Sequence, residues 1–466
     1  MSFDPEGKRI VVLGLARSGI AAARLLSGAG ASVVATDLRD EASLGIDAGD
    51  WRRLGIELVL GSHPRTLLDD ADLLVVSPGV RSDASFVVEA ASRGVDVIGE
   101  LELAYRMSTA PWIAITGTNG KTTTTALTGA LVKTLGRPTA VAGNIGVAVS
   151  GEVQGVPHDG FIVAEVSSFQ LDTTRDFRPA VAACLNITPD HLDRYDSMDH
   201  YARSKARVFA NQQEDDVAIL NVDDPRTAAL ADGIRSRVLS VSSAREVEHG
   251  AYVRGGTVVL RMDGREREIV EADQLGIKGP HNLANALAAL AAAAAVGVEA
   301  GPAAEVLKAF RPLEHRMEPV AELDGVLYVN DSKATNIEST RCALTSFERP
   351  IVLIAGGRDK GSDFTTLQDL VAERVKHLVL IGEAVEAMEK ALGGQAPVSR
   401  AATLADALRE ARRAAADGDV VLLSPACASF DMFDDFEHRG RAFKEAVGEV
   451  GDASSRDRSA RATARD

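Results

Sequence analysis

The sequence predicts an α/β protein with three α/β domains: a Rossmann-like amino-terminal domain, a central ATPase domain of the P-loop type and a Rossmann-like carboxyl-terminal domain. Short apolar runs alternate with helical stretches along nearly the whole chain, a pattern that favours parallel sheets. The chain has 466 residues, enough for about three domains of ordinary size. A Gly- and Thr-rich loop directly after one apolar run adds the P-loop expectation.

Composition narrows the class of protein. Apolar residues make up 45% of the chain and charged residues 25%, which is ordinary for a soluble globular protein. The net charge of −16 argues against nucleic acid as a partner, because duplex binding needs a basic surface. The amino terminus has no apolar leader and no segment is long and apolar enough to span a bilayer. We therefore expect a cytoplasmic protein without a membrane partner, and a monomer.

The cysteine spacing predicts neither disulfides nor a metal site. The three cysteines, Cys184, Cys342 and Cys427, lie far apart and form no C-x-x-C pair. Neither a disulfide framework nor a zinc site is indicated.

The first domain is expected at residues 1–98. Its five apolar runs are Ile10–Leu13, Val33–Thr36, Ile56–Leu60, Leu73–Val76 and Val95–Ile98. The turn Gly14–Gly19 resembles a dinucleotide fingerprint, but Ala16 replaces the middle glycine and crowds a pyrophosphate. Asp37 stands where such folds place a carboxylate on a ribose or base, and Arg39 follows it. NAD is one candidate ligand, disfavoured by Ala16.

The second domain is expected at residues 99–312. The strand Trp112–Ile115 leads into TGTNGKTTTT, residues 116–125. Gly117 and Gly120 allow a tight turn whose N–H groups face an anion, Lys121 reaches the β- and γ-phosphates, and Thr122 ligates Mg²⁺. The spacing is one of a shortened P-loop, since Ile115 stands where the general pattern has glycine. An ordinary strand-to-helix turn is the alternative.

Further strands of this domain are expected at Ala140–Ala142, Phe161–Ala164, Ala180–Leu185 and Val217–Leu220, with a hairpin-like stretch around residues 255–264. An Ala-rich helix begins near His281. The third domain, residues 313–450, has runs at Val326–Val329, Ile351–Ala355, Leu378–Ile381 and Val420–Leu423. Residues 451–466 contain no apolar residue larger than alanine, and we expect this tail to be disordered.

Three further side chains suggest chemistry beside the phosphate loop. Glu165 ends a strand, where a carboxylate is suited to Mg²⁺; a solvated loop carboxylate is the alternative. His191 lies just past another strand and by itself is as easily structural. Lys205 lies on a helix, where a solvated lysine is the default.

These residues belong to a larger set of motifs. GNIG begins at Gly143, EVSSFQL at Glu165, NITPDHLDRY at Asn186, HNLANA at His281, EHRME at Glu314, NDSKATN at Asn330, GGRDKGSDF at Gly356 and LSPACASFDMF at Leu423. Together with the phosphate loop, Tyr201 and Lys205, they resemble the Mur ligases over essentially the whole chain except the tail. The later motifs resemble the branch that adds D-glutamate.

The resemblance implies an activity. The protein is expected to be an ATP-dependent amide ligase that joins D-glutamate to UDP-N-acetylmuramoyl-L-alanine through an acyl phosphate. ADP and phosphate are released, and the product serves cytoplasmic peptidoglycan precursor synthesis. The expected cofactors are two Mg²⁺ ions and a CO₂-derived carbamate on Lys205, which turns an ammonium into an anionic oxygen ligand.

The resemblance also assigns residues. The implied catalytic residues are Lys121, Glu165, His191, Lys205 and Lys333, of which Glu165, His191 and Lys205, with Thr122, would hold metal. The implied ATP contacts are Gly117, Thr118, Asn119, Gly120, Lys121, Thr122, Thr123, Asn282, Asn285, Arg316 and Asp331. The implied contacts to the UDP precursor are Ser18, Thr36, Asp37, Arg39, Asn144 and His191. The implied D-glutamate contacts are Thr335, Lys360, Ser429 and Phe436.

Other functions share parts of this pattern. Folylpolyglutamate synthetase shares the ATP core but not the first-domain features. The related ligase for a diamino acid usually carries an Asp-Asn-Pro-Arg motif, which this chain lacks. A P-loop switch without ligase activity would keep the phosphate loop yet have no reason for His191, Lys205 and Lys360.

Overall fold

The computed structural model describes residues 3–144, 146–190, 194–311, 314–359 and 361–463, with side chains up to residue 450. Its contacts divide the chain into two compact units. The first unit comprises residues 1–187, 197–275 and 282–309, and the second comprises residues 188–196, 276–281 and 310–466. The predicted domain boundaries stay predictions. The central and carboxyl-terminal sheets each lie within one predicted range, and the amino-terminal sheet passes the end of its range by one residue, Gly99.

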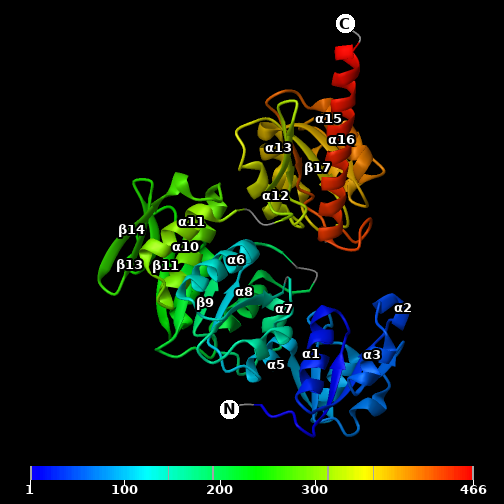
Figure 1. The fold of residues 1–466 in the computed structure, drawn as a ribbon, viewed down its shortest axis with the longest axis vertical. Helices are drawn as coiled ribbons and strands as arrows, with labels where there is room; N and C mark the ends of the chain where they lie inside the picture. Colours follow the sequence, from blue (N-terminus) through cyan, green and yellow to red (C-terminus); the bar gives the residue numbers. More distant parts are fainter. Residues whose placement is uncertain (1–2, 145, 191–193, 312–313, 360, 464–466) are drawn as a thin grey trace. The chain divides into compact units, whose positions relative to one another are not determined.

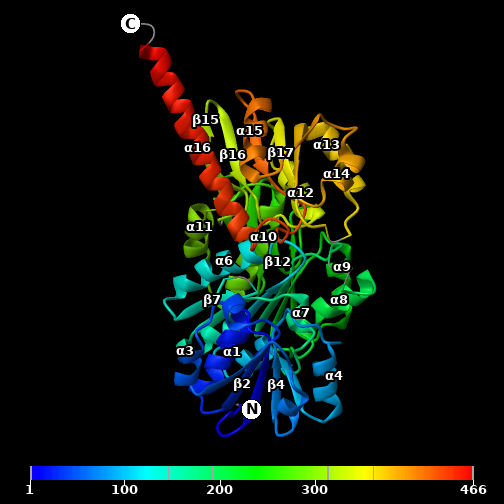
Figure 2. The same ribbon diagram turned by 90° about the vertical axis from the view of Figure 1, so that its right-hand side faces the viewer.

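The amino-terminal sheet has five parallel strands in the order β3-β2-β1-β4-β5. They are β1 (Arg9–Leu13), β2 (Ser32–Asp37), β3 (Ile56–Leu60), β4 (Leu73–Val76) and β5 (Asp96–Gly99). Helices α1 (Arg17–Gly28), α3 (Ala48–Arg53) and α5 (Glu100–Arg106) pack on one face, and α4 (Ser85–Ser92) packs on the other (Figure 2). Short helix α2 spans Glu41–Leu44. All five predicted strands are observed.

The central sheet has nine strands in the order β14-β13-β12-β11-β10-β9-β6-β8-β7. The strands are β6 (Trp112–Thr116), β7 (Thr139–Gly143), β8 (Phe161–Glu165), β9 (Val181–Cys184), β10 (Val217–Asn221), β11 (Arg237–Ser242), β12 (Gly250–Arg254), β13 (Thr257–Met262) and β14 (Arg265–Glu271). The strands from β12 to β7 pair in parallel, while β13 and β14 pair antiparallel at one edge (Figure 1). Its helices are α6 (Lys121–Val132), α7 (Ser168–Leu171), α8 (Met198–Ala206), α9 (Pro225–Ala228), α10 (Pro280–Ala295) and α11 (Ala300–Ala309).

The carboxyl-terminal sheet has six strands in the order β15-β16-β20-β17-β18-β19. They are β15 (Glu318–Leu323), β16 (Val326–Asn330), β17 (Ile351–Gly356), β18 (Val375–Ile381), β19 (Val398–Arg400) and β20 (Val420–Leu423). Helices α12 (Ile337–Leu344), α13 (Gln368–Arg374) and α14 (Val385–Leu392) cover one face, and α15 (Leu404–Ala414) and α16 (Phe436–Thr463) cover the other. Only β15 runs antiparallel to its neighbour. The predicted fold class is confirmed.

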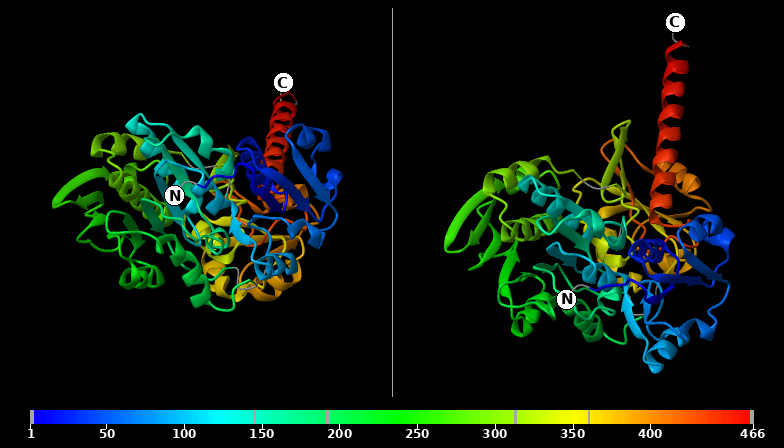
Figure 3. Two further views of the ribbon diagram at one scale, coloured as in Figure 1. Left: turned by 90° about the horizontal axis from the view of Figure 1, so that it is seen from below. Right: turned by 60° about the horizontal axis from the view of Figure 1, so that its bottom comes forward.

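Helix α16 differs from the expectation for the tail. It continues to Thr463, past the sheet on which it packs (Figures 1 and 3), so the backbone is helical through most of the segment expected to be disordered. In the described part of the chain, no helix combines the length and hydropathy that a membrane span needs.

One buried carboxylate joins the first two sheets within the first unit. Glu102 of α5 is fully buried and accepts backbone N–H groups from the loop before β9, at Arg175 (2.9 Å), Asp176 (2.9 Å) and Phe177 (3.2 Å). It also accepts Nε of Arg106 at 2.7 Å. Buried N–H groups need such partners.

Glu102→Gln should lower the free energy of unfolding of the first unit by about 2–3 kcal/mol, because an amide cannot accept at both positions and leaves buried donors unsatisfied. Urea denaturation would measure the change. Glu57→Gln, an exposed site on β3, is the matched control and should change it by less than about 0.5 kcal/mol. Equal effects of the two substitutions would contradict this account.

Candidate functional site

The first loop of the amino-terminal sheet is held tightly. Gly14 has a φ of 88°, and a Cβ on Gly19 would lie 1.8 Å from the Gly14 carbonyl oxygen, so glycine is needed at both places. Ala16, in contrast, has an extended backbone with φ −81° and ψ −176°. Any residue adopts that conformation, so the backbone at Ala16 does not require glycine. Ala16 caps α1 with no side-chain hydrogen bond.

Asp37 organises this loop. Its carboxylate accepts the backbone N–H of Leu15 at 2.7 Å and pairs with Arg39, whose Nη2 lies 3.0 Å away. Burial would raise the pKa of Asp37, but the hydrogen bonds from Arg39 and Leu15 outweigh it and lower the pKa to about 2. Ser18 lies in the first turn of α1. Of the predicted residues at this sheet edge, Asp37 and Arg39 are in direct contact, and Ser18 belongs to the helix that follows the loop.

The Thr36 side chain points into the protein interior. Its side chain is fully buried and its hydroxyl lies 2.8 Å from Nδ1 of His63, while its carbonyl accepts the N–H of Gly14 at 2.9 Å. Thr36 thus stabilises the Gly14–Gly19 loop through this backbone hydrogen bond.

The phosphate loop forms as predicted between β6 and α6. Gly120 has a φ of 84°, and Gly117 has a φ of 147°. A Cβ on Gly117 would lie 3.0 Å from Cβ of Leu185, and one on Gly120 would lie 2.2 Å from Oδ1 of Asn285. Both glycines are required by conformation and by space.

Two asparagines fix this loop. Asn186, which follows β9, accepts the N–H of Asn119 through Oδ1 (2.8 Å) and that of Thr118 through its carbonyl (2.9 Å). Asn285 of α10 is buried, lies 3.3 Å from the Thr124 hydroxyl and donates to Asn282 at 3.3 Å. The predicted residues 117–123, 282 and 285 therefore lie together, with Thr122 and Thr123 in the first turn of α6.

Two lysines point at the loop. Nζ of Lys121 donates to the carbonyls of Gly117 (3.0 Å) and Thr118 (2.7 Å). Lys205 of α8 is 1% exposed, and its Nζ donates to the Gly117 carbonyl at 2.8 Å. The same ammonium lies 4.4 Å from the centre of the Tyr201 ring. Lys205 is therefore not the solvated lysine of the default interpretation.

Glu165 ends β8 at the same sheet edge. It is 2% exposed and stands beside Ile115 of β6 in the strand register. Asn144 donates from Nδ2 to its Oε1 at 3.1 Å. Glu165 is thus a buried, oriented carboxylate rather than a solvated one.

In the second unit, the turn after residue 313 presents Arg316. Nε of Arg316 is buried and has no hydrogen-bond partner among the described residues. The backbone N–H of the next residue, Met317, donates to Oδ1 of Asp331 at 3.2 Å. Burial raises the pKa of Asp331 to about 6, although Arg316 and the hydroxyl of Ser424 oppose the shift.

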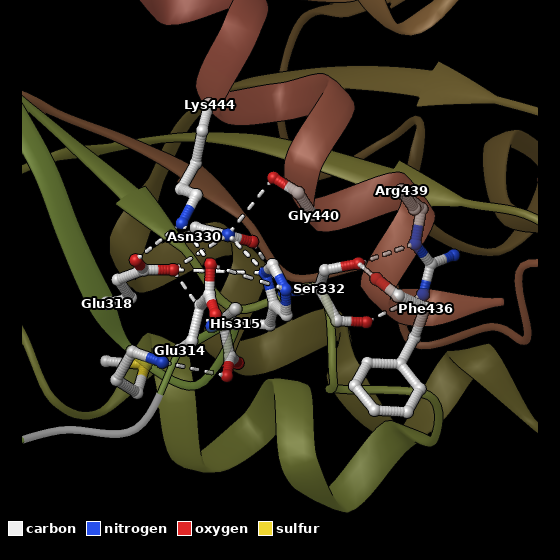
Figure 4. A network of polar contacts seen from close by, with 11 residues as sticks. Glu314, His315, Glu318, Asn330, Ser332, Phe436, Arg439, Gly440 and Lys444 are labelled. Carbon is white, nitrogen blue, oxygen red and sulfur yellow. Dashed lines mark hydrogen bonds and ion pairs between the residues drawn. The ribbon is translucent and has the colours of Figure 1, made fainter. Parts of the chain in front are cut away.

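Of the residues expected around D-glutamate, Thr335, Ser429 and Phe436 are described, and they follow β16 and β20 in the chain. Ser332 donates its hydroxyl to the Phe436 carbonyl at 2.8 Å and accepts Nε of Arg439 at 3.0 Å (Figure 4). Nζ of Lys333 lies 5.4 Å from the Phe436 ring centre. Ser429 is 2% exposed. Thr335 follows in the same loop and donates its N–H to the Lys333 carbonyl at 2.9 Å.

Arg439 is a buried cation beside these loops that the sequence analysis did not single out. It is 1% exposed and donates Nη2 to the carbonyl of Ser332 (2.8 Å) and Nη1 to that of Cys427 (3.3 Å). Burial lowers the pKa of Arg439 to about 10, so it remains charged at neutral pH. The sequence does contain one indication of this burial. Arg439 lies four residues before Phe443, so a helix places both side chains on the same apolar face.

Two predicted residues, His191 and Lys360, lie outside the described residues. In the part of the chain that is described, no three His, Cys, Asp or Glu side chains gather as a metal cluster.

Comparison with known proteins agrees with the geometry. Residues 8–99 match the family described as "Mur ligase MurD-like, N-terminal domain", residues 115–293 the "Mur ligase middle domain" and residues 315–427 the "Mur ligase, glutamate ligase domain". The chain belongs to the Mur ligase family. A relative from Pelotomaculum thermopropionicum, named UDP-N-acetylmuramoylalanine--D-glutamate ligase, is 48% identical over 96% of this chain and 99% of its own. A protein of the same name from Geotalea uraniireducens is 47% identical over 96% of this chain and 99% of its own.

Solved structures show the Mur ligase fold alone, because their sequences are distant. A pseudomurein peptide ligase type C from Methanothermus fervidus aligns with a TM-score of 0.61 and 18% identity, covering 95% of this chain and all of the other. MurF from Acinetobacter baumannii aligns with a TM-score of 0.60 and 18% identity, covering 96% and 93% of the two chains.

The donor set of this Mur ligase fits Mg²⁺. The buried carboxylate of Glu165 and the hydroxyl of Thr122 offer hard oxygen atoms beside the loop, and Mg²⁺ prefers few carboxylates together with phosphate oxygens and water. Lys205 fits only in a modified form, because an ammonium cannot ligate a cation.

Gly120→Ala should weaken ATP binding by more than about tenfold, because the added Cβ displaces the loop or Asn285 and shifts the N–H groups. Gly136→Ala is the matched control, since Gly136 also has a positive φ (69°) but open space around its Cβ position. Calorimetric titration with ATP and Mg²⁺ would measure both. Equal weakening by the two would show that backbone strain alone, and not the loop geometry, is responsible.

Proposed function

We propose that this Mur ligase joins D-glutamate to UDP-N-acetylmuramoyl-L-alanine with hydrolysis of ATP to ADP and phosphate. The observation that carries the proposal is a complete phosphate loop with two lysines on it, in a chain that matches named D-glutamate ligases over 96% of its length. The product would serve peptidoglycan precursor synthesis in the cytoplasm. The enzyme is proposed to act as a monomer.

ATP is proposed to bind through the loop residues 117–123. The N–H groups of this loop and of the first turn of α6 favour an anion, and Lys121 supplies a charge. Asn282 and Asn285 would flank the adenine. In the second unit, Arg316 would contact a phosphate and Asp331 the ribose.

The uridine precursor is proposed to bind at the amino-terminal sheet. Ser18 and the uncapped start of α1 supply donors, and Arg39 supplies a cation that Asp37 orients. Thr36 contributes by shaping this loop. Asn144 and His191 would approach the diphosphate.

D-Glutamate is proposed to bind at the loops that follow β16 and β20. A substrate with two carboxylates needs cations and neutral donors. Lys333 and Lys360 would supply charge, while Thr335, Ser429 and the Phe436 backbone would supply hydrogen bonds.

The reaction needs activation, because an amine cannot displace oxide from a carboxylate. The γ-phosphoryl group moves to the alanyl carboxylate, so that an acyl phosphate forms and ADP leaves. The D-glutamate amine then attacks the carbonyl carbon, loses a proton, and the tetrahedral intermediate expels phosphate. Both steps bring anions together, and Lys121 and Arg316 would offset the repulsion.

Two Mg²⁺ ions would neutralise phosphate charge in both steps. Glu165 and Thr122 are the proposed ligands of one, and His191 and a carbamate on Lys205 those of the other. In support of the carbamate, Lys205 is 1% exposed and its Nζ lies 2.8 Å from the Gly117 carbonyl of the phosphate loop.

Phosphate release from ATP should require both UDP-N-acetylmuramoyl-L-alanine and D-glutamate. L-Glutamate, L-lysine and meso-diaminopimelate are the comparison acceptors, and mass spectrometry should identify the amide. Release without an acceptor would indicate a plain NTPase, and preference for a diamino acid would indicate the related ligase.

Lys205→Ala should lower kcat by more than about a hundredfold, because the proposed metal ligand is lost. A short added carboxylate should restore part of the activity by replacing the carbamate oxygens. Arg203→Ala, on the same helix, is the control and should remain active. Full activity of the Lys205→Ala variant would contradict the proposed role of Lys205 as a carbamylated metal ligand.

A further inference from the structure

The turn that carries Arg316 is strained. His315 has a φ of 62° and Met317 a φ of 46°, so two side-chain-bearing residues flank Arg316 in the left-handed region. Such conformations persist only where surrounding contacts impose them, and they cluster at functional sites. Nε of Arg316 is buried and has no partner among the described residues. The fold therefore holds this strained turn in place while leaving one buried donor of the Arg316 guanidinium unsatisfied by the described residues.

Two carboxylates hold the backbone of the turn. Oε2 of Glu318 accepts the N–H of His315 at 2.9 Å, and Oδ1 of Asp331 accepts the N–H of Met317 at 3.2 Å. The carbonyl of His315 accepts the N–H of Lys333 at 3.1 Å. Both residues with a positive φ are thus fixed by hydrogen bonds.

Asn330, the last residue of β16, joins these contacts (Figure 4). It is fully buried, and its Nδ2 lies 3.0 Å from Nδ1 of His315, 3.0 Å from Oε2 of Glu318 and 3.2 Å from the Gly440 carbonyl. Its Oδ1 accepts the N–H of Ser332 at 3.2 Å. One amide therefore connects the turn, the strand end and α16.

Helix α16 completes the arrangement. Lys444 donates to Oε1 of Glu318 at 3.1 Å and also pairs with Glu314. At Gly440 a Cβ would lie only 2.2 Å from Nδ1 of His315. Helix α16 thus leaves room for the His315 ring at Gly440. Its Lys444 neutralises the Glu318 carboxylate, which accepts the His315 N–H.

We propose that Asn330 is a positioning residue that acts through Arg316, with Glu318 and Lys444 as its supports. The amide holds the His315 ring and the Glu318 carboxylate so that the strained turn presents the Arg316 guanidinium to a nucleotide phosphate. This inference rests on the proposed function, because it takes the phosphate to be that of ATP. A bond that only stabilised the fold would have no reason to depend on Arg316.

A double-mutant cycle tests this dependence. Asn330→Asp keeps the Oδ1 acceptor but replaces the donating amide by a carboxylate facing Glu318. The variants Asn330→Asp, Arg316→Ala and the double substitution are titrated with the non-hydrolysable analogue adenylyl imidodiphosphate and Mg²⁺ in the full chain. Asn330→Asp should raise Kd by about tenfold in the wild-type background and by less than about twofold in the Arg316→Ala background.

Additive effects in the two backgrounds, or an unchanged Kd for Asn330→Asp, would overturn the proposal. If Asn330→Asp shows no cooperative thermal transition, the cycle is run with Lys444→Gln instead. We expect Lys444→Gln to raise the Kd for the analogue by about threefold in the wild-type background and to leave it unchanged in the Arg316→Ala background. Arg441→Gln makes the same charge change at an exposed site on the same helix and should leave Kd unchanged. If Arg441→Gln raised Kd as much as Lys444→Gln, that result would also overturn the proposal.

The readout separates this inference from the proposed function. Binding of the analogue needs no acceptor, so the cycle gives its answer whether or not D-glutamate is ligated. The acceptor comparison decides the ligase activity independently of the turn.

Discussion

The site depends on the parallel pairing of strands, because the carboxyl ends of parallel neighbours lie at one edge of a sheet. In the first unit this edge gathers the phosphate loop after β6, Glu165 at the end of β8 and Asn186 after β9. In the second unit it gathers Asn330 at the end of β16, Asp331 and Ser332 just after it, and the loop with Ser429 after β20. Ligands in open α/β sheets bind at such edges.

Both charged and neutral groups hold the loops at these edges. The carboxylates of Asp37, Glu318 and Asp331 accept backbone N–H groups, and amide side chains add further contacts. Asn186 and Asn285 fix the phosphate loop, and Asn330 fixes the turn of Arg316. Arg439 is satisfied by carbonyl and hydroxyl oxygens, so its charge adds a fixed positive potential beside Ser332. In a chain of net charge −16, such local cations are what an anionic substrate would meet.

Periodicity predicted most strands because their apolar runs are buried on both faces. It missed β15, a half-exposed edge strand that contains Pro319, and β19, which has three residues. It also missed β11, whose alternating pattern is interrupted by polar residues. The phosphate loop was predictable because its chemistry is local in sequence. Asn330 was not given a role, since its partner Gly440 lies 110 residues away and only the folded chain joins them.

The central claim is that ATP activates the alanyl carboxylate as an acyl phosphate. The most direct measurement uses UDP-N-acetylmuramoyl-L-alanine with both carboxylate oxygens replaced by ¹⁸O, together with ATP and D-glutamate. The account predicts that each released phosphate carries one ¹⁸O atom and that the other remains in the amide carbonyl. Phosphate free of ¹⁸O, with amide formed, would contradict the account.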